Sequence, residues 1–133
     1  MKGVIFFGTP DNVQQQRSKL QQESISLAQH LNLHFRVLET TDPFFALDAA
    51  NKRTFQAAMK LKYEMQCFIP QTKKWLAVAS FNLHRDHLIK AYMITGSSQT
   101  LHSGCIGFGL ERLLYAIYCQ QGLTANFIED NNA

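Results

Sequence analysis

Residues 104–117 read Gly-Cys-Ile-Gly-Phe-Gly-Leu-Glu-Arg-Leu-Leu-Tyr-Ala-Ile, a glycine-rich strand pattern that leads into an apolar helix pattern. Glycine has no side chain to pack inside a strand, so glycines at 104, 107 and 109 indicate close approach by a ligand or by another backbone. Arg112 follows at the start of the helix, where its guanidinium could contact a phosphate or pair with Glu111 or Glu64. We expect a strand over 101–108 and a helix over 110–121 that ends at Gly122.

The segments just upstream predict further strands. Residues 63–69 and 75–83 are rich in apolar and aromatic side chains and flank a turn at 70–74, which favours an antiparallel hairpin. Residues 90–95 have a similar composition, so they are expected to form a second strand pair with residues 101–108.

The N-terminal part predicts a strand over 3–8 and then a long helix, because Thr9-Pro10 combines an N-cap with proline at the first helical position. The helix should reach Leu31, and the alternation over 33–38 predicts another strand. Apolar side chains at three- and four-residue intervals over 44–61 predict a basic amphipathic helix. Hairpin strands with helices before and after them indicate an α+β fold, an antiparallel sheet flanked by helices.

Composition limits the class of protein. The chain has 133 residues, of which 46% are hydrophobic, which is enough for one core, so we expect a single domain over 1–128 and a flexible tail over 129–133. A net charge of +3 does not argue for nucleic acid, and three cysteines without a paired motif do not suggest disulfides. No apolar run is long enough for a membrane span, and a cytoplasmic protein is expected.

One strand carries a polar face. Ser80, Asn82 and His84 alternate with apolar residues, so they should share one side of the sheet and form the floor of a pocket. His84, Asp86 and His87 could instead be read as metal ligands, but their spacing matches no strong motif, and hydrogen-bonded side chains at a strand end are the commoner case.

Together these segments resemble a known family, the amino acid:carrier protein ligases, which are homologues of seryl-tRNA synthetases without a tRNA-binding arm. The glycine-rich strand that runs into Glu111-Arg112 looks like motif 3 of class II aminoacyl-tRNA synthetases. The ordered series that carries the resemblance is Gly8-Thr9-Pro10, Asp42-Pro43-Phe44-Phe45, Lys62-Tyr63-Glu64, Ala79-Ser80, Asn82, His84, Asp86-His87 and His102-Ser103-Gly104-Cys105 before Gly109-Leu110-Glu111-Arg112. The match covers nearly the whole chain.

The resemblance implies a class II fold and activation of a small amino acid with ATP and Mg²⁺, followed by transfer to the phosphopantetheine thiol of a carrier protein. It places ATP at Arg112, Glu111 and Ser80. It places the substrate pocket at Asn82, His84, Gly107 and Gly109. In seryl-type enzymes the serine that matches Ser80 helps to hold the metal of the nucleotide, together with a glutamate three residues earlier. Ala77 stands at the position of that glutamate here.

The resemblance also implies a zinc site that this sequence does not complete. Cys105 matches the last zinc cysteine, whereas the zinc glutamate falls at Gly3. In this alignment the chain is N-terminally truncated and begins inside motif 2, so motif 1, the motif 2 arginine loop and the first zinc cysteine would lie before Met1. A catalytic zinc needs about three protein ligands, so no zinc is expected here. Cys67 and Cys119 do not match the missing ligands and are expected to be small buried hydrophobic residues.

The predicted helix over 44–61 corresponds to the family's carrier-docking helix, and Lys52, Arg53 and Lys60 would complement an acidic carrier protein, although a solvated basic face fits equally well. Two functions stay open: a binding module for a nucleotide or a carrier protein, and an enzyme whose missing half comes from another chain. No tRNA partner is expected. An unpaired apolar edge over 3–8 favours a homo-oligomer, namely a dimer.

Overall fold

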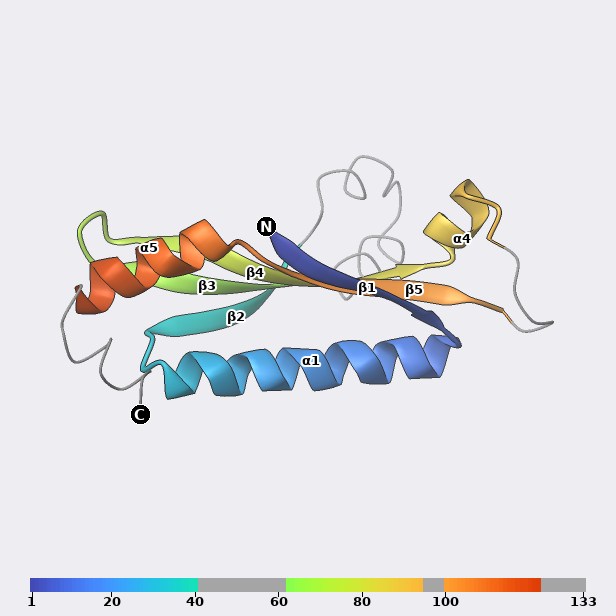
Figure 1. Cartoon of the computed structure of the whole chain (residues 1–133), viewed down its shortest axis with the longest axis horizontal. Helices are drawn as coiled ribbons and strands as arrows, with labels where there is room; N and C mark the ends of the chain where they lie inside the picture. Colours follow the sequence, from blue (N-terminus) through green and yellow to red (C-terminus); the bar gives the residue numbers. More distant parts are fainter. Residues whose placement is uncertain (41–61, 95–99, 123–133) are drawn as a thin grey trace.

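The computed structural model of the chain describes residues 1–40, 62–94 and 100–122. The elements follow in the order β1 (Lys2–Gly8), α1 (Pro10–His30), β2 (Phe35–Thr40), β3 (Lys62–Ile69), β4 (Lys74–Arg85), α4 (His87–Ala91), β5 (His102–Phe108) and α5 (Leu110–Gln121). The described strands form one five-stranded antiparallel sheet in the order β1-β5-β4-β3-β2, and Figure 1 shows α1 running along it. The expected α+β fold is confirmed.

Both long helices begin and end where local chemistry predicts. Thr9 caps α1 by accepting a hydrogen bond from the backbone N–H of Asn12 at 3.3 Å, and Pro10 occupies the first turn. Gly122 follows α5 with a φ of 72°, a conformation that favours glycine. The start of α1 and the end of α5 are therefore set by local sequence.

The core lies on the face of the sheet that α1 covers. Phe81 on the central strand β4 is fully buried, and its cross-strand neighbours are Tyr63 on β3 and Ile106 on β5. Ala28 of α1 and Ala116 of α5 belong to the same buried cluster. Since side chains alternate along a strand, the residues between these core positions face the other side of the sheet.

The predicted strand over 90–95 is wrong. Residues 87–91 form the short helix α4, in which the Nζ of Lys90 lies 2.9 Å from a carboxylate oxygen of Asp86, one helical turn away. β5 pairs instead with β1 on one side and β4 on the other. The composition of 90–95 suited a strand, but both edges of β5 are already used.

Several expectations concern residues that the structure does not describe. The predicted helix over 44–61, with Lys52, Arg53 and Lys60, and the tail over 129–133 lie outside the described ranges. Within the described ranges, no helix is both long enough and apolar enough to cross a membrane.

Candidate functional site

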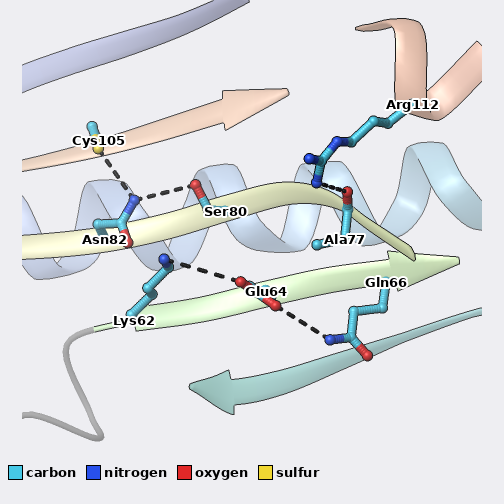
Figure 2. Close-up of polar contacts among 8 residues, drawn as sticks. All are labelled: Lys62, Glu64, Gln66, Ala77, Ser80, Asn82, Cys105 and Arg112. Carbon is cyan, nitrogen blue, oxygen red and sulfur yellow. Dashed lines mark hydrogen bonds and ion pairs between the residues drawn. The ribbon is translucent and has the colours of Figure 1, made fainter. Parts of the chain in front are cut away.

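The polar face predicted for β4 exists and faces away from α1. Figure 2 shows Ser80 and Asn82 in front of the strands, with a helix behind them. The Nδ2 of Asn82 donates to the Oγ of Ser80 and to the Sγ of Cys105, both at 3.3 Å. Asn82 and Cys105 are cross-strand partners, so the register of β4 and β5 brings this group together.

A β-bulge determines which residues of β4 reach this face. The pairing of β4 with β3 shifts at Met65/Gln66, which oppose Ala79 and Ala77, so Val78 is the extra residue. Ala77 pairs with Gln66, and Ser80 pairs with Glu64. In a regular strand, residues 77 and 80 would point to opposite faces of the sheet. The bulge at Val78 puts both on the face that carries the polar residues.

A cavity of about 340 Å³ opens on this face between β3, β4, β5 and the start of α5. It is lined by several of the residues expected to bind ATP or substrate: Ser80, Gly107, Gly109, Glu111 and Arg112. Asn82 and His84 are not among its lining residues; they lie further along β4, beside Cys105. The expected site is thus one cavity with a polar cluster next to it.

Arg112 reaches over the sheet from the first turn of α5. Its Nη1 donates to the backbone oxygen of Ala77 at 3.3 Å, as Figure 2 shows. Arg112 takes part in neither of the ion pairs found within the described ranges, so the expected alternative, a carboxylate clamp by Glu111 or Glu64, is not what holds it. A long hydrogen bond to a neutral carbonyl leaves most donors of the guanidinium fork available to an anion.

Two further charged groups of the cavity, Lys62 and Glu64, come from β3, and neither was expected to bind a ligand. Glu64 lies opposite Ser80 and accepts a hydrogen bond from the Nε2 of Gln66 at 3.2 Å. Its second oxygen lies 4.0 Å from the Nζ of Lys62 (Figure 2). The tripeptide Lys62-Tyr63-Glu64 did carry the family resemblance, but only the register of β3 against β4 places its charges beside Ser80.

The glycines of the motif serve two purposes. A Cβ on Gly104 would lie 2.7 Å from the Phe6 ring and 2.9 Å from the backbone oxygen of Asn82, so this glycine permits close backbone packing. A Cβ on Gly107 would meet only Met1 within 4 Å, its sulfur at 3.7 Å. Gly107 therefore leaves open space in the cavity, so that a ligand could come close to the backbone there.

Cys105 lies in a hydrogen-bonded cluster. Its Sγ is 3.3 Å from the Nε2 of His84, and the Nδ1 of the same imidazole is 3.0 Å from the Oγ of the fully buried Ser103. Burial, with a smaller contribution from the nearby His87, lowers the pKa of His84, so its neutral form is favoured in the folded protein. This cluster holds the imidazole in one orientation beside the thiol.

These residues do not fit the zinc site of the resembled family. Within the described ranges, no three His, Cys, Asp or Glu side chains lie close enough to share a metal ion. A glutamate in place of Gly3 would not fit without movement, since its Cβ would lie 2.7 Å from the backbone oxygen of Ile106. The alternative ligand set around Asp86 is likewise not gathered as a metal site within the described ranges, and the Asp86 carboxylate lies 2.9 Å from the Nζ of Lys90.

We expect the protein, purified without added zinc, to carry no stoichiometric zinc at Cys105, because the cluster supplies only a thiol and one imidazole. Metal analysis by mass spectrometry tests this expectation. One tightly held zinc per chain that disappears in Cys105→Ser would contradict it.

No protein-family model matches the chain, but curated relatives do. Over 123 residues it is 32% identical to amino acid–acyl-carrier-protein ligase 1 of Bradyrhizobium diazoefficiens, a match that covers 92% of this chain and 38% of the relative. Over 126 residues it is 25% identical to the type-2 serine–tRNA ligase of Methanopyrus kandleri, covering 89% of this chain and 24% of the relative. The chain is a homologue of these two kinds of ligase.

The fold of this ligase homologue has a solved counterpart. M. kandleri SerRS, in the crystal structure of its complex with A. aeolicus tRNASec, superposes with a TM-score of 0.77 at 22% identity, over 93% of this chain and 25% of that one. The class II fold implied by the sequence resemblance is confirmed. The homologue spans little more than a third of the carrier-protein ligase that it matches and about a quarter of the serine–tRNA ligase.

Proposed function

We propose that this chain binds ATP with Mg²⁺ in the cavity under Arg112, as the nucleotide-binding part of an amino acid–acyl-carrier-protein ligase-like protein in the cytoplasm, and that it does not activate an amino acid by itself. The observation that carries the proposal is that one cavity gathers Ser80, Gly107, Gly109, Glu111 and Arg112 from β4, β5 and α5. Homology to two ATP-dependent ligase groups supports the same ligand.

The cavity has the chemistry of a phosphate site. Arg112 offers a planar fork of donors, and the N-terminus of α5 presents backbone N–H groups and the positive end of the helix dipole. Gly109 caps that helix without a side-chain hydrogen bond, so the first N–H groups are not used by a cap side chain. Lys62 adds a second positive charge on the opposite wall.

Magnesium would be held through oxygen ligands on the same face. Glu64 and Ser80 are cross-strand partners, and carboxylate and hydroxyl oxygens are ligands that Mg²⁺ accepts alongside phosphates. The bound ion would neutralise phosphate charge. Ala77 occupies the place where seryl-type enzymes carry a further carboxylate, so this chain is expected to hold the ion with fewer ligands.

The polar cluster beside the cavity is the proposed contact for a small amino acid. Asn82 and His84 present an amide and a neutral imidazole, and both are anchored by hydrogen bonds to neighbouring side chains. Cys105 and His84 lie there, and Gly3 stands where the resembled family has a zinc glutamate, so we expect no zinc to hold the ammonium group of that amino acid. Binding of nucleotide without adenylate formation is therefore the expected activity of the chain alone.

Replacing Arg112 by alanine should weaken Mg·ATP binding tenfold or more, because loss of one charged contact to phosphate costs roughly 1.5–3 kcal/mol. Isothermal titration calorimetry measures the affinity directly. Lys19→Ala is the matched control, since Lys19 is an exposed cation on α1 outside the lining of this cavity, and its removal should leave the affinity unchanged.

Two results would contradict the nucleotide-binding half of the proposal. One is no heat of binding for the unmodified protein at millimolar Mg·ATP, and the other is equal affinity for the protein and Arg112→Ala. ATP–pyrophosphate exchange that depends on an added amino acid would show that the chain is a complete enzyme and would overturn the second half of the proposal.

The proposed macromolecular partner is a carrier protein rather than tRNA. The supporting observations are the homology to acyl-carrier-protein ligases and the basic residues Lys52, Arg53 and Lys60, which would complement an acidic partner. A carrier-binding module without nucleotide binding is the alternative, and the calorimetric titration separates the two.

A further inference from the structure

The carboxylate of Glu64, the proposed magnesium ligand, has a different neighbour at each oxygen. Its Oε2 accepts a hydrogen bond from the Nε2 of Gln66 at 3.2 Å, and its Oε1 lies 4.0 Å from the Nζ of Lys62. The three residues alternate along β3, so they share the face of the sheet on which the cavity opens. Lys62 and Glu64 line the cavity and Gln66 does not. A residue outside the cavity therefore holds the carboxylate inside it.

The side-chain amide of Gln66 is oriented by Arg36 on the neighbouring strand β2. Arg36 and Gln66 are cross-strand partners, and the Nε of Arg36 donates to the Oε1 of Gln66 at 2.8 Å. A guanidinium has only donors and an ionised carboxylate only acceptors, so the amide satisfies both only with its oxygen toward Arg36 and its nitrogen toward Glu64. Figure 2 shows the nitrogen of Gln66 on the side of Glu64.

Arg36 is held in place although it is exposed. Its guanidinium carbon lies 4.2 Å from the ring centroid of Trp75, a stacking contact that fixes the plane of the fork. The rings of Phe68 and His34 lie around the same indole, with centroids 5.3 and 5.2 Å from it. An aromatic cluster at one end of the sheet is thus connected, through Arg36 and Gln66, to the carboxylate in the cavity.

We propose that Gln66 and Arg36 are positioning residues for a divalent cation: they hold the Glu64 carboxylate so that one oxygen meets the cation in a fixed orientation. The inference rests on the proposed function, in which Glu64 and Ser80 contact the magnesium ion of Mg·ATP. With Oε2 engaged by Gln66, Oε1 is the oxygen available to the cation. Its ion pair with Lys62 is long, at 4.0 Å, so the cation can replace Lys62 there.

Residues that hydrogen-bond to a metal ligand contribute to metal affinity without touching the metal, and their loss typically lowers that affinity roughly 10-fold to 100-fold. Neither Gln66 nor Arg36 lines the cavity, so their effect should be confined to the metal-dependent part of nucleotide binding. Arg112 differs from them, since its loss should weaken ATP binding with or without metal.

The affinity for ATP, measured by isothermal titration calorimetry of the full chain with Mg²⁺ and again with EDTA, tests the proposal. Magnesium should tighten ATP binding, and Arg36→Glu should reduce that gain roughly tenfold. An acceptor at position 36 attracts the Nε2 of Gln66 and turns Oε1 toward Glu64, where two acceptors repel each other. Gln66→Met, which offers Glu64 no donor, should reduce the gain in the same way.

Arg36→Lys and Lys74→Glu are the matched controls. Arg36→Lys keeps a donor for Gln66 and should keep the gain. Lys74→Glu makes the same change of charge at an exposed position next to Trp75, outside the cavity lining, and should also keep it. Reversal of charge alone would weaken the binding of metal-free ATP, the more highly charged ligand, at least as much as that of Mg·ATP, so it would not reduce the gain.

Nitrogen-15 NMR of the Gln66 side-chain amide tests the orientation without any ligand. The signal is assigned by its absence from Gln66→Met. Glu64→Gln should shift this signal in the otherwise unmodified protein, because it replaces the charged acceptor of the amide. The same change should have no effect in the Arg36→Glu background, where the amide nitrogen faces residue 36 instead.

Equal gains from Mg²⁺ in Arg36→Glu and in the unmodified protein would overturn the inference and leave the proposed nucleotide site standing. Loss of the gain in Lys74→Glu as well would also overturn it, because charge and not orientation would be responsible. If the unmodified protein bound no ATP, the proposed function would fall and the amide signal would decide the inference alone. A response to Glu64→Gln that is the same in the Arg36→Glu background would then overturn it.

Discussion

Phe81→Ala should lower the free energy of unfolding by about 3–5 kcal/mol, because it removes an aromatic ring from a fully buried position and leaves a cavity. Phe81 sits on the central strand between Tyr63 and Ile106, in the cluster to which both long helices contribute. The surrounding backbone is held by strand pairing on both sides and cannot collapse into the space. Urea denaturation followed by circular dichroism measures the loss.

Leu114→Ala serves as the control for this measurement. Leu114 lies on α5 and is 59% exposed, so its truncation should cost well under the ~1.5–3 kcal/mol that a fully buried leucine contributes. If the two variants were equally stable, the buried cluster would not be the main source of stability.

Gly104→Ala should cost about 1–3 kcal/mol although it adds a single methyl group, because that carbon would lie 2.9 Å from the backbone oxygen of Asn82 and 2.7 Å from the Phe6 ring. The Phe6 ring could turn, but the carbonyl belongs to the neighbouring strand of the sheet. Thermal or urea unfolding would show the loss, and the loss should appear without any ligand.

Gly107→Ala is the matched substitution three residues along the same strand. Its new carbon would meet only the Met1 side chain within 4 Å, the sulfur at 3.7 Å, so stability should change little. Its effect should fall on nucleotide binding, because Gly107 lines the cavity. If Gly104→Ala were as stable as Gly107→Ala and as the unmodified protein, the close approach at Gly104 would not be a real constraint.

Most elements of the fold could be predicted because their signals are local. Thr9-Pro10 predicted the start of α1, and the glycine-rich run before Arg112 predicted β5 and α5. The hairpin of β3 and β4 followed from composition around a polar turn. The strand expected over 90–95 does not form as predicted, since β5 pairs instead with β1, a contact between residues about a hundred positions apart in the sequence.

The shared face of the candidate residues on β4 could be predicted, and the arrangement of the cavity could not. Ser80, Asn82 and His84 were expected on one polar face, and the alternation along β4 is enough to place them there. Alternation cannot show that, of these three residues, Ser80 alone lines the cavity with Arg112. It also cannot show that Glu64 lies opposite Ser80. Register between strands decides both points, and register depends on the bulge at Val78, for which the sequence offers no clear signal.

That bulge has an evolutionary consequence. In a regular strand, side chains three residues apart point to opposite faces of the sheet. Two such side chains could share one site only if the backbone were rearranged. Here the backbone already presents 77 and 80 toward the same cavity, and alanine codons become glutamate or aspartate codons through one nucleotide change. A carboxylate beside Ser80 is thus a single mutational step away, on a backbone that already directs position 77 toward the cavity.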